Sequence, residues 1–194
     1  MFISWYSIVG MPITDTDFTT AITTASSSGN WNYSTYGHIS TWDVGAVTDM
    51  SNTFKNKTNF NEDISGWNME NVTNTASMFE NALKFNQYIG DWSMGAVTNT
   101  AYMFDRATSF NQPIGDWSMG RVENTSKMFR HAAAFNQPIG DWSMGSVKNT
   151  SLMFYGATKF NKPIGVWDMG SVTDTAGMFQ EATDFNQDIS GWNM

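Results

Sequence analysis

IGDWSMGAVTNTAYMFDRATSFNQP, residues 89–113, is one copy of a unit that recurs along most of the chain. Residues at the same position of successive copies form a column, and each column advances in steps of 25 residues. The tryptophan column consists of Trp42, Trp67, Trp92, Trp117, Trp142, Trp167 and Trp192. Columns of isoleucine and phenylalanine, such as Ile89–Ile114 and Phe104–Phe129, keep the same register. This register predicts stacked units that bury a core no single unit could bury.

Within the unit, Trp92 and Met94 are two residues apart, which places both on one face of an expected strand. Asn99 belongs to a column of Asn and Asp that we interpret as helix N-caps. Apolar residues three apart over 101–110 then predict a helix of about two turns, and Pro113 ends it. The expected fold is an α/β solenoid, a right-handed coil of about seven 25-residue units with a parallel strand ribbon and short helices.

The composition of the chain argues against several classes of partner and cofactor. The 194 residues carry a net charge of −8, with 10 Lys plus Arg against 18 Asp plus Glu, which argues against a nucleic-acid partner. The absence of cysteine excludes disulfides, zinc–thiolate sites and iron–sulfur clusters, and no cofactor is expected. No run approaches the roughly 18 apolar residues of a membrane span, so membrane insertion is not expected.

Two regions are expected. Residues 1–35 form an N-terminal cap with a short helix after Thr14, and residues 36–194 form the tandem repeats, which stop in mid-unit. Residues 2–13 carry no charge but are too short to span a bilayer and lack the basic region of a signal peptide. The stop in mid-unit suggests either a piece of a longer protein or copies that associate through an open C-terminal coil.

The string Ile89-x-x-Trp92-x-Met94-x-x-Val97 resembles the framework of leucine-rich repeats. Its 25-residue form, with Phe-Asn-Gln-Pro, Val-Thr-Asn and Met-Phe-x-x-Ala, resembles the BspA-like repeats of bacterial surface proteins and lipoproteins. The resemblance implies a cell-surface or extracellular location and a non-enzymatic interaction or adhesion function with a protein or glycan partner. Because the chain has no cysteine, it offers no attachment point for a lipoprotein anchor.

Two polar columns invite a functional interpretation. The asparagine column is expected to be a structural ladder that bonds to the backbone of neighbouring units; it consists of Asn61, Asn86, Asn111, Asn136, Asn161 and Asn186. Asp91, Asp116 and Asp141 precede tryptophan in three consecutive units. Three aligned carboxylates form a weak calcium candidate, with solvated or turn-forming aspartates as the favoured interpretation.

Positions that vary between units are better candidates for recognition. We expect a recognition surface on outward positions of the predicted helices; it consists of Tyr102, Asp105, Lys127, Arg130, Leu152 and Tyr155. The two histidines, His38 and His131, lie in different units, and no catalytic constellation is evident, so an enzyme is not expected.

The leading hypothesis is therefore a non-enzymatic interaction or adhesion module. The alternative is a self-assembling fibre or scaffold subunit. A minor alternative is ice binding through threonine pairs such as Thr73 and Thr75.

Overall fold

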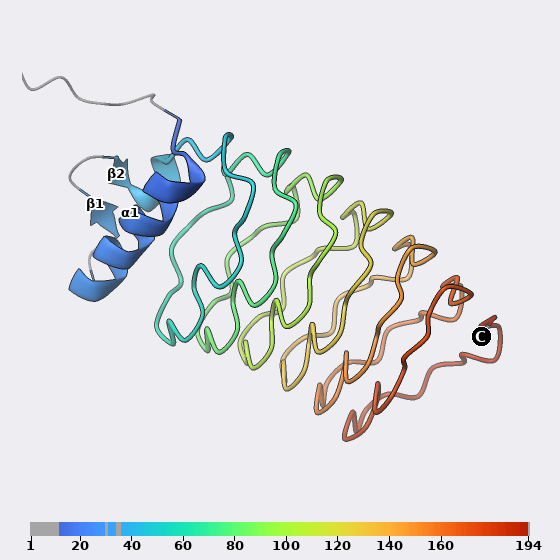
Figure 1. Ribbon diagram of the computed structural model, residues 1–194. Coiled ribbons are helices and arrows are strands. Elements are labelled where there is room, and N and C mark those ends of the chain that lie inside the picture. Colours follow the sequence, from blue (N-terminus) through green and yellow to red (C-terminus); the bar gives the residue numbers. More distant parts are fainter. Residues whose placement is uncertain (1–11, 30, 34–35, 194) are drawn as a thin grey trace, which may run out of the picture.

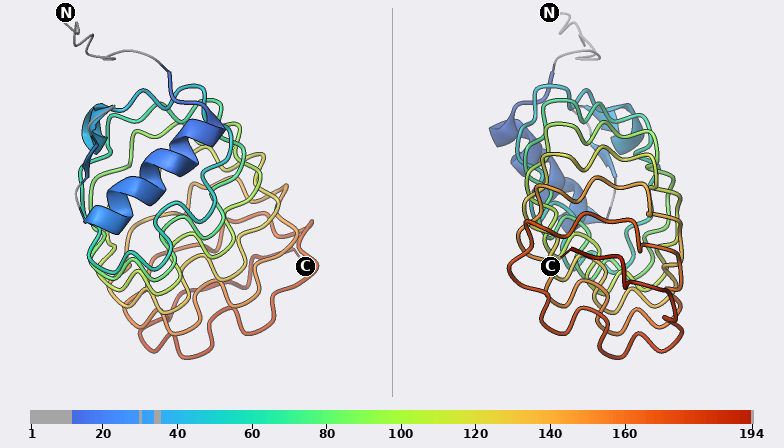
Figure 2. Two further views of the ribbon diagram at one scale, coloured as in Figure 1. Left: turned by 60° about the vertical axis from the view of Figure 1, so that its left-hand side comes forward. Right: turned by 90° about the vertical axis from the view of Figure 1, so that its right-hand side faces the viewer.

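The computed structural model describes residues 12–29, 31–33 and 36–193. Its regular elements are the helix α1 (Asp15–Ser28), the strands β1 (Asn32–Tyr33) and β2 (Gly37–His38), which pair antiparallel, and a 3-10 helix, Ile39–Thr41. The rest of the described chain consists of irregular coils of 25 residues, stacked one on another (Figure 1). Helix α1 covers one end of the stack, and the chain's C-terminus lies at the other (Figure 2).

The predicted α/β solenoid is wrong, because residues 42–193 hold neither a helix nor a strand ribbon. Over residues 101–110 the backbone makes successive turns, closed by bonds such as Asp105 N to Tyr102 O at 3.0 Å and Ala107 N to Phe104 O at 3.0 Å. These bonds join residues three apart, which produces the apolar spacing of three that predicted a helix. Tyr102 has φ of 60° and Arg106 has φ of 59°, which no right-handed helix accommodates.

The predicted N-cap interaction also takes another form. Asn99 Oδ1 accepts from the backbone N–H of Ala101, two residues on, at 3.0 Å. This bond makes an Asx turn, a local alternative to the helix start that the sequence pattern suggested.

The predicted parallel ribbon is replaced by isolated bridges. Neighbouring coils share single parallel bridges at the Asn or Asp column, such as Asn99–Asn124. The N–H groups of Trp92 and Val97 are used within their own coil, in turns to Ile89 and Met94. Without free N–H groups at these positions, a continuous ladder cannot form there.

The coils are joined by a different set of backbone bonds, made at alternate residues of the turn segment. The N–H groups of Thr100, Tyr102, Phe104 and Arg106 donate to the carbonyls of Asn124, Ser126, Met128 and Arg130 at 3.0, 2.9, 2.9 and 2.7 Å. Each donor reaches the residue 24 positions further on, and the same pattern recurs between earlier and later coils. The intervening N–H groups close turns inside the coil, so the backbone polar groups are satisfied without regular secondary structure.

Aromatic columns form the core. Trp92 and Trp117 stack with ring centroids 6.5 Å apart and planes 4° apart, and Trp117 Nε1 donates to the Ile89 carbonyl at 3.0 Å. Phe104 stacks on Phe110 of the same coil at 4.0 Å. These side chains are almost fully buried, and rings stacked in this manner combine large apolar area with a specific geometry.

Helix α1 closes the first coil. Thr14 caps it by accepting from the backbone N–H of Asp17, and Gly29 ends it with φ of 66°. Phe18 and Ile22 are buried, and the Phe18 ring meets Trp67 edge-on at 5.6 Å. Within the described residues, no helix has the length and apolar character to cross a membrane.

Candidate interaction surfaces

The strained turn positions carry large side chains. Tyr102, Lys127 and Leu152 occupy one column and have φ of 60°, 57° and 55°. The same column begins with Asn52 and ends with Gly177, residues that adopt this conformation at less cost. Residues with branched or bulky side chains lose roughly 1–2 kcal/mol in the left-handed region. We call Tyr102, Lys127, Arg130, Leu152 and Tyr155 together the turn surface.

A polar network links the turn surface to the core. Lys127 Nζ donates to the Tyr102 hydroxyl at 2.6 Å and lies 4.6 Å from the centre of that ring. Arg130 donates two hydrogen bonds to the Asp105 carboxylate, from Nε to Oδ1 at 3.0 Å and from Nη2 to Oδ2 at 2.5 Å. Asp105 is completely buried, so the prediction that it points outward is wrong. The Asp105 carboxylate, by accepting these bonds, raises the pKa of Arg130.

The last part of the turn surface has its own partners. The Tyr155 hydroxyl donates to Glu181 Oε1 at 2.6 Å, which raises the pKa of Tyr155. The His131 ring meets Tyr155 edge-on at 5.0 Å. Leu152 lies against Gly177, where an added Cβ would come within 2.7 Å of it. The turn surface thus combines aromatic, aliphatic and charged groups on consecutive coils.

The asparagine column runs from coil to coil through side-chain bonds. Asn111 Oδ1 accepts from the backbone N–H of Asn136 at 2.9 Å and from Gln137 Nε2 at 2.9 Å. Equivalent backbone bonds join the remaining neighbours of the column, which are Asn61, Asn86, Asn136, Asn161 and Asn186. Each side chain from Asn61 to Asn161 therefore accepts from a donor of the next coil.

The aspartate column offers separate, exposed carboxylates. Asp91, Asp116 and Asp141 are all exposed, and Asp91 accepts from the Tyr88 hydroxyl at 2.8 Å, which raises the pKa of Tyr88. Across the part of the chain that the structure describes, no three acidic or histidine side chains come together closely enough to hold a metal ion.

One cluster of polar side chains was missed at the sequence level. His38 Nδ1 lies 2.9 Å from Ser40 Oγ, and His38 Nε2 lies 3.5 Å from Glu62 Oε2. These are residue types that nucleophilic catalysis uses. However, the same Nδ1 accepts from the Ser40 backbone N–H at 3.3 Å, so the histidine caps the 3-10 helix. His38 and Glu62 are also widely exposed, with 45% and 37% of each side chain accessible.

The structure also locates the threonine pairs and the C-terminal coil, the two other surfaces that the sequence pattern suggested. Thr75 and Thr100 are completely buried, so the threonine pairs do not present two exposed ranks. In the last coil, Phe179 and Trp192 are only partly buried, whereas their counterparts Phe154 and Trp167 are buried. Association through this coil stays a prediction, and Met194 lies outside the described residues, as do residues 2–11 of the uncharged stretch.

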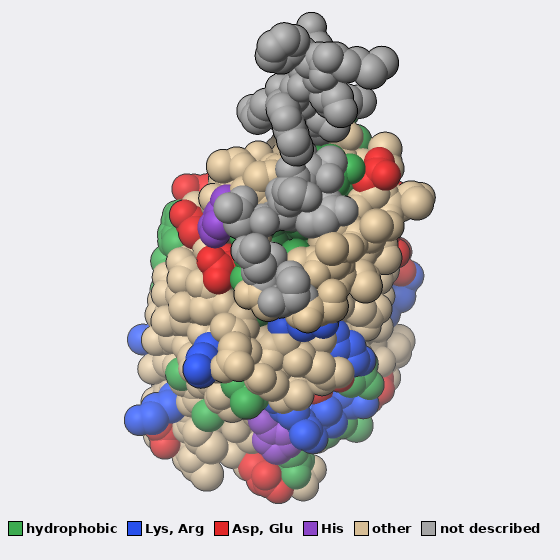
Figure 3. All heavy atoms as spheres, turned by 90° about the vertical axis from the view of Figure 1, so that its left-hand side faces the viewer, with side chains coloured by type: hydrophobic (Ala, Val, Ile, Leu, Met, Phe, Trp, Pro, Cys, Tyr) green, Lys and Arg blue, Asp and Glu red, His purple; other side chains and the backbone are tan. Residues whose placement is uncertain are grey.

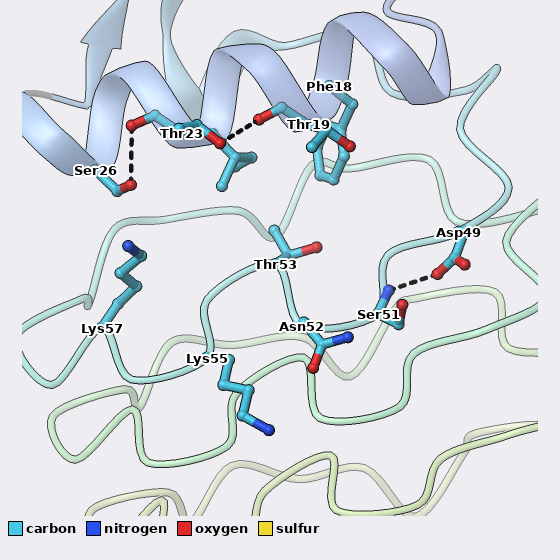
Figure 4. A pocket seen from close by; sticks show the side chains of 11 residues that line it. Phe18, Thr19, Thr23, Ser26, Asp49, Ser51, Asn52, Thr53, Lys55 and Lys57 are labelled. Carbon is cyan, nitrogen blue, oxygen red and sulfur yellow. Dashed lines mark hydrogen bonds between the residues drawn. The ribbon is translucent and has the colours of Figure 1, made fainter.

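A groove runs between α1 and the first coil (Figure 4). Its central hollow has a volume of about 280 Å³ and is lined by Phe18 and Ile22, by threonine and serine side chains of α1, and by residues of the segment 49–57. Lys55 pairs with Glu80 at 2.8 Å. Figure 3 shows lysine and arginine side chains gathered in the lower half of the face that it presents.

Comparison with known proteins replaces the expected family. Neither the curated proteins nor the solved structures contain a match to the chain. The family model described as "Mycoplasma protein of unknown function, DUF285" matches residues 20–142 and 114–194. This finding, together with the absence of helices and strands from residues 42–193, overturns the assignment to BspA-like leucine-rich repeats. Because the two matches together extend over residues 20–194, the chain belongs to this DUF285 family.

Proposed function

We propose that the chain is a non-enzymatic interaction module whose turn surface binds a protein partner. One observation carries the proposal: large side chains occupy left-handed turn positions that asparagine or glycine would occupy at less cost. Strain of this kind persists where the surrounding structure imposes it, and it gathers at sites that bind ligands. Here the strained residues stand side by side on consecutive coils and place Tyr102, Lys127 and Leu152 in one row.

The chemistry of the turn surface suits a protein interface. Tyrosine and arginine are enriched among the residues that dominate binding energy at such interfaces. Arg130 is held by the buried Asp105, and Tyr155 by Glu181, so neither side chain needs extensive reordering on binding. A row of side chains held in place by hydrogen bonds on stacked coils suits the recognition of a partner.

The test replaces the strained side chains with asparagine, which tolerates positive φ. A Tyr102→Asn/Leu152→Asn double variant should keep its fold, because Asn52 occupies the same column. Wild type and variant are compared on an array of purified secreted and cell-surface proteins. We expect wild type to bind at least one of these proteins and the double variant to bind it at least tenfold more weakly.

A matched control exchanges the same residue types elsewhere. Tyr88 and Leu83 are 43% and 37% exposed and have no positive φ, so Tyr88→Asn/Leu83→Asn should bind like wild type. Retention of every partner by the Tyr102→Asn/Leu152→Asn variant would contradict the proposal. So would a wild-type protein that binds none of the arrayed proteins.

A further inference from the structure

A row of exposed side chains runs along three consecutive coils. Asp116 and Asp141 of the aspartate column are exposed, and no described lysine or arginine forms an ion pair with either. The next coil holds Val166 at the same position, with 83% of the residue accessible. We call Asp116, Asp141 and Val166 the acidic row. Along the stack it presents an acid, a second acid and an aliphatic side chain.

The turn surface contains a row of the same length. Tyr102, Lys127 and Leu152, which we call the turn row, occupy one column of three consecutive coils. Lys127 Nζ donates to the Tyr102 hydroxyl at 2.6 Å, so the hydroxyl keeps its own hydrogen for another acceptor. Among the described residues, no acidic side chain pairs with Lys127. The turn row therefore presents a hydroxyl donor, a cation and an aliphatic side chain, in that order.

The acidic groups around the turn row are already bound. Asp105 pairs with Arg130, Glu80 pairs with Lys55, and Glu181 accepts from Tyr155. Arg106, from the same coil as Tyr102, has 55% of its side chain exposed and lies 4.0 Å from the buried Asp105. Although the chain carries a net charge of −8, this part of the turn surface presents exposed positive charge, which suits an acidic partner.

The two rows match each other in sequence order. The matching pairs lie 14 residues apart: Tyr102–Asp116, Lys127–Asp141 and Leu152–Val166. A shift by one coil would place either Leu152 opposite Asp141 or Lys127 opposite Val166. Only the unshifted register, with the two stacks parallel, pairs the lysine with a carboxylate and the leucine with the valine. The next position of both columns is glycine, Gly177 and Gly191, which adds no side chain between the stacks.

We propose that the acidic row of one copy of this chain binds the turn row of a second copy, with the stacks parallel and in this register. The inference rests on the proposed function, because it names the partner of the turn surface. The two rows are different surfaces, so a copy that binds through one keeps the other available, and association continues beyond a dimer unless a ring closes. At about 0.15 M salt, charges more than about 8 Å apart are largely screened, so the contacts outweigh the repulsion between two acidic chains.

Charge reversal tests the pairing of Lys127 with Asp141. Sedimentation velocity of the wild type should show a mean mass that rises with concentration above that of a single chain. Asp141→Lys places a lysine opposite Lys127, and Lys127→Glu places a glutamate opposite Asp141, so each variant alone should associate at least tenfold more weakly. An equal mixture of the two variants should recover wild-type association, because each reversed row then meets an opposite charge. This recovery also shows that both variants are folded.

Matched controls and cross-links test the register. Lys84→Glu and Asp184→Lys make the same charge changes at exposed positions outside both rows and should associate like the wild type. The chain has no cysteine, so Leu152→Cys mixed with Val166→Cys should form a disulfide between copies, which requires Cα atoms within about 7 Å. Leu152→Cys mixed with Asp91→Cys, three coils out of register, should not.

Several results would overturn the inference: a wild type that stays monomeric, reversal variants that associate like the controls, a mixture that fails to recover association, or cross-links that ignore the register. The chain itself is added to the protein array described above. A wild type that binds another arrayed protein but not itself would overturn this inference alone, whereas a wild type that binds neither would overturn the proposed function as well.

Discussion

Asp15 Oδ1 accepts a hydrogen bond from the backbone N–H of Thr48 at 2.7 Å and so takes the place of the carbonyl that a preceding coil would supply. In the next coil the equivalent N–H, that of Thr73, donates to a backbone carbonyl of its neighbour, Thr48 O, at 2.8 Å. The first coil has no such neighbour. Asp15 also accepts from the Thr48 hydroxyl at 2.7 Å and from the Asp49 N–H at 3.3 Å. A single carboxylate in the first turn of α1 thus satisfies the donors at this corner of the stack.

Removing this carboxylate should destabilise the first coil. Asp15→Ala leaves the Thr48 N–H without its acceptor, and we expect unfolding free energy to fall by about 1–2 kcal/mol, discounted because Asp15 is exposed. Asp17→Ala removes a charge from the same helix turn but no bond to the first coil, so it reports the helix contribution alone. Urea denaturation measures both. Equal losses for the two variants would show that Asp15 acts only on its own helix.

The same contact predicts a pH dependence. Burial by itself would raise the pKa of Asp15, but the hydrogen bonds from Thr48 and Asp49 outweigh it and hold the pKa below 3.8. A lowered pKa in the folded state contributes stability that is fully present above 3.8 and is lost as pH falls through the folded value. The stability difference between wild type and Asp15→Asn should therefore be constant from about pH 7 to pH 5 and shrink below 3.8. A difference that stays unchanged at pH 3 would contradict the assignment.

The sequence pattern predicts which side chains stack on one another better than it predicts the path of the backbone. Residues 25 apart, such as Trp92 and Trp117, stack on one another, and the period alone names such pairs. The path between them is another matter, because an apolar spacing of three is shared by a helix and by successive turns. What separates the two is the positive φ at Tyr102 and Arg106. The residue types do not predict this conformation, because tyrosine and arginine rarely adopt a positive φ.

The burial of Asp105 and the groove beside α1 could not be predicted from the sequence, because both depend on contacts between coils. Asp105 stands in a column that also holds Lys55 and Tyr155, and such variation is typical of an exposed position. Its burial depends on one partner, Arg130 of the next coil, in the same column. The groove is still harder to foresee, because it exists only where α1 replaces a coil and leaves carbonyls without donors. Backbone groups have no sequence signature.

The strained column predicts a stabilising substitution. Leu152 has φ of 55°, and asparagine accepts this region at lower cost, so Leu152→Asn should raise unfolding free energy by about 0.5–1 kcal/mol after some loss of packing on Gly177. Leu83→Asn is the control, because Leu83 has no positive φ; Leu83 is exposed, whereas Leu152 is half-buried. Thermal and urea unfolding should separate the two variants. A loss of stability in Leu152→Asn equal to that in Leu83→Asn would mean that strain is absent.

Breaking the ion pair between Asp105 and Arg130 should destabilise the fold strongly, whereas replacing both residues with apolar ones should destabilise it little. Arg130→Met leaves the Asp105 carboxylate buried, and among the described residues its one remaining ion-pair partner is Arg106 at 4.0 Å. We expect the unfolding free energy to fall by about 3–5 kcal/mol. Asp105→Leu/Arg130→Met removes both charges and should recover most of that loss, because an apolar pair of similar volume needs no desolvation. A double-mutant cycle with Asp105→Leu alone measures the coupling. Additive losses in the cycle would exclude a direct interaction between the two side chains.

The asparagine ladder offers a test in which position alone differs. Asn111 Oδ1 serves two donors of the next coil, the Asn136 N–H and Gln137 Nε2, both at 2.9 Å, whereas no described residue donates to Asn186 Oδ1. Asn111→Ala leaves the Asn136 N–H without a partner, which should cost about 1–3 kcal/mol, while Asn186→Ala should cost less than about 0.5 kcal/mol.

A third variant separates the lost acceptor from the lost volume. Asn111→Asp keeps an oxygen at the same place and should retain most of the stability at neutral pH, because carboxylate and amide oxygens accept the same bonds. Amide hydrogen exchange gives the site-specific measurement: the Asn136 N–H should exchange faster in Asn111→Ala and at nearly the wild-type rate in Asn111→Asp. If Asn136 stays equally protected in both variants, the N–H has another acceptor and the ladder does not join these coils.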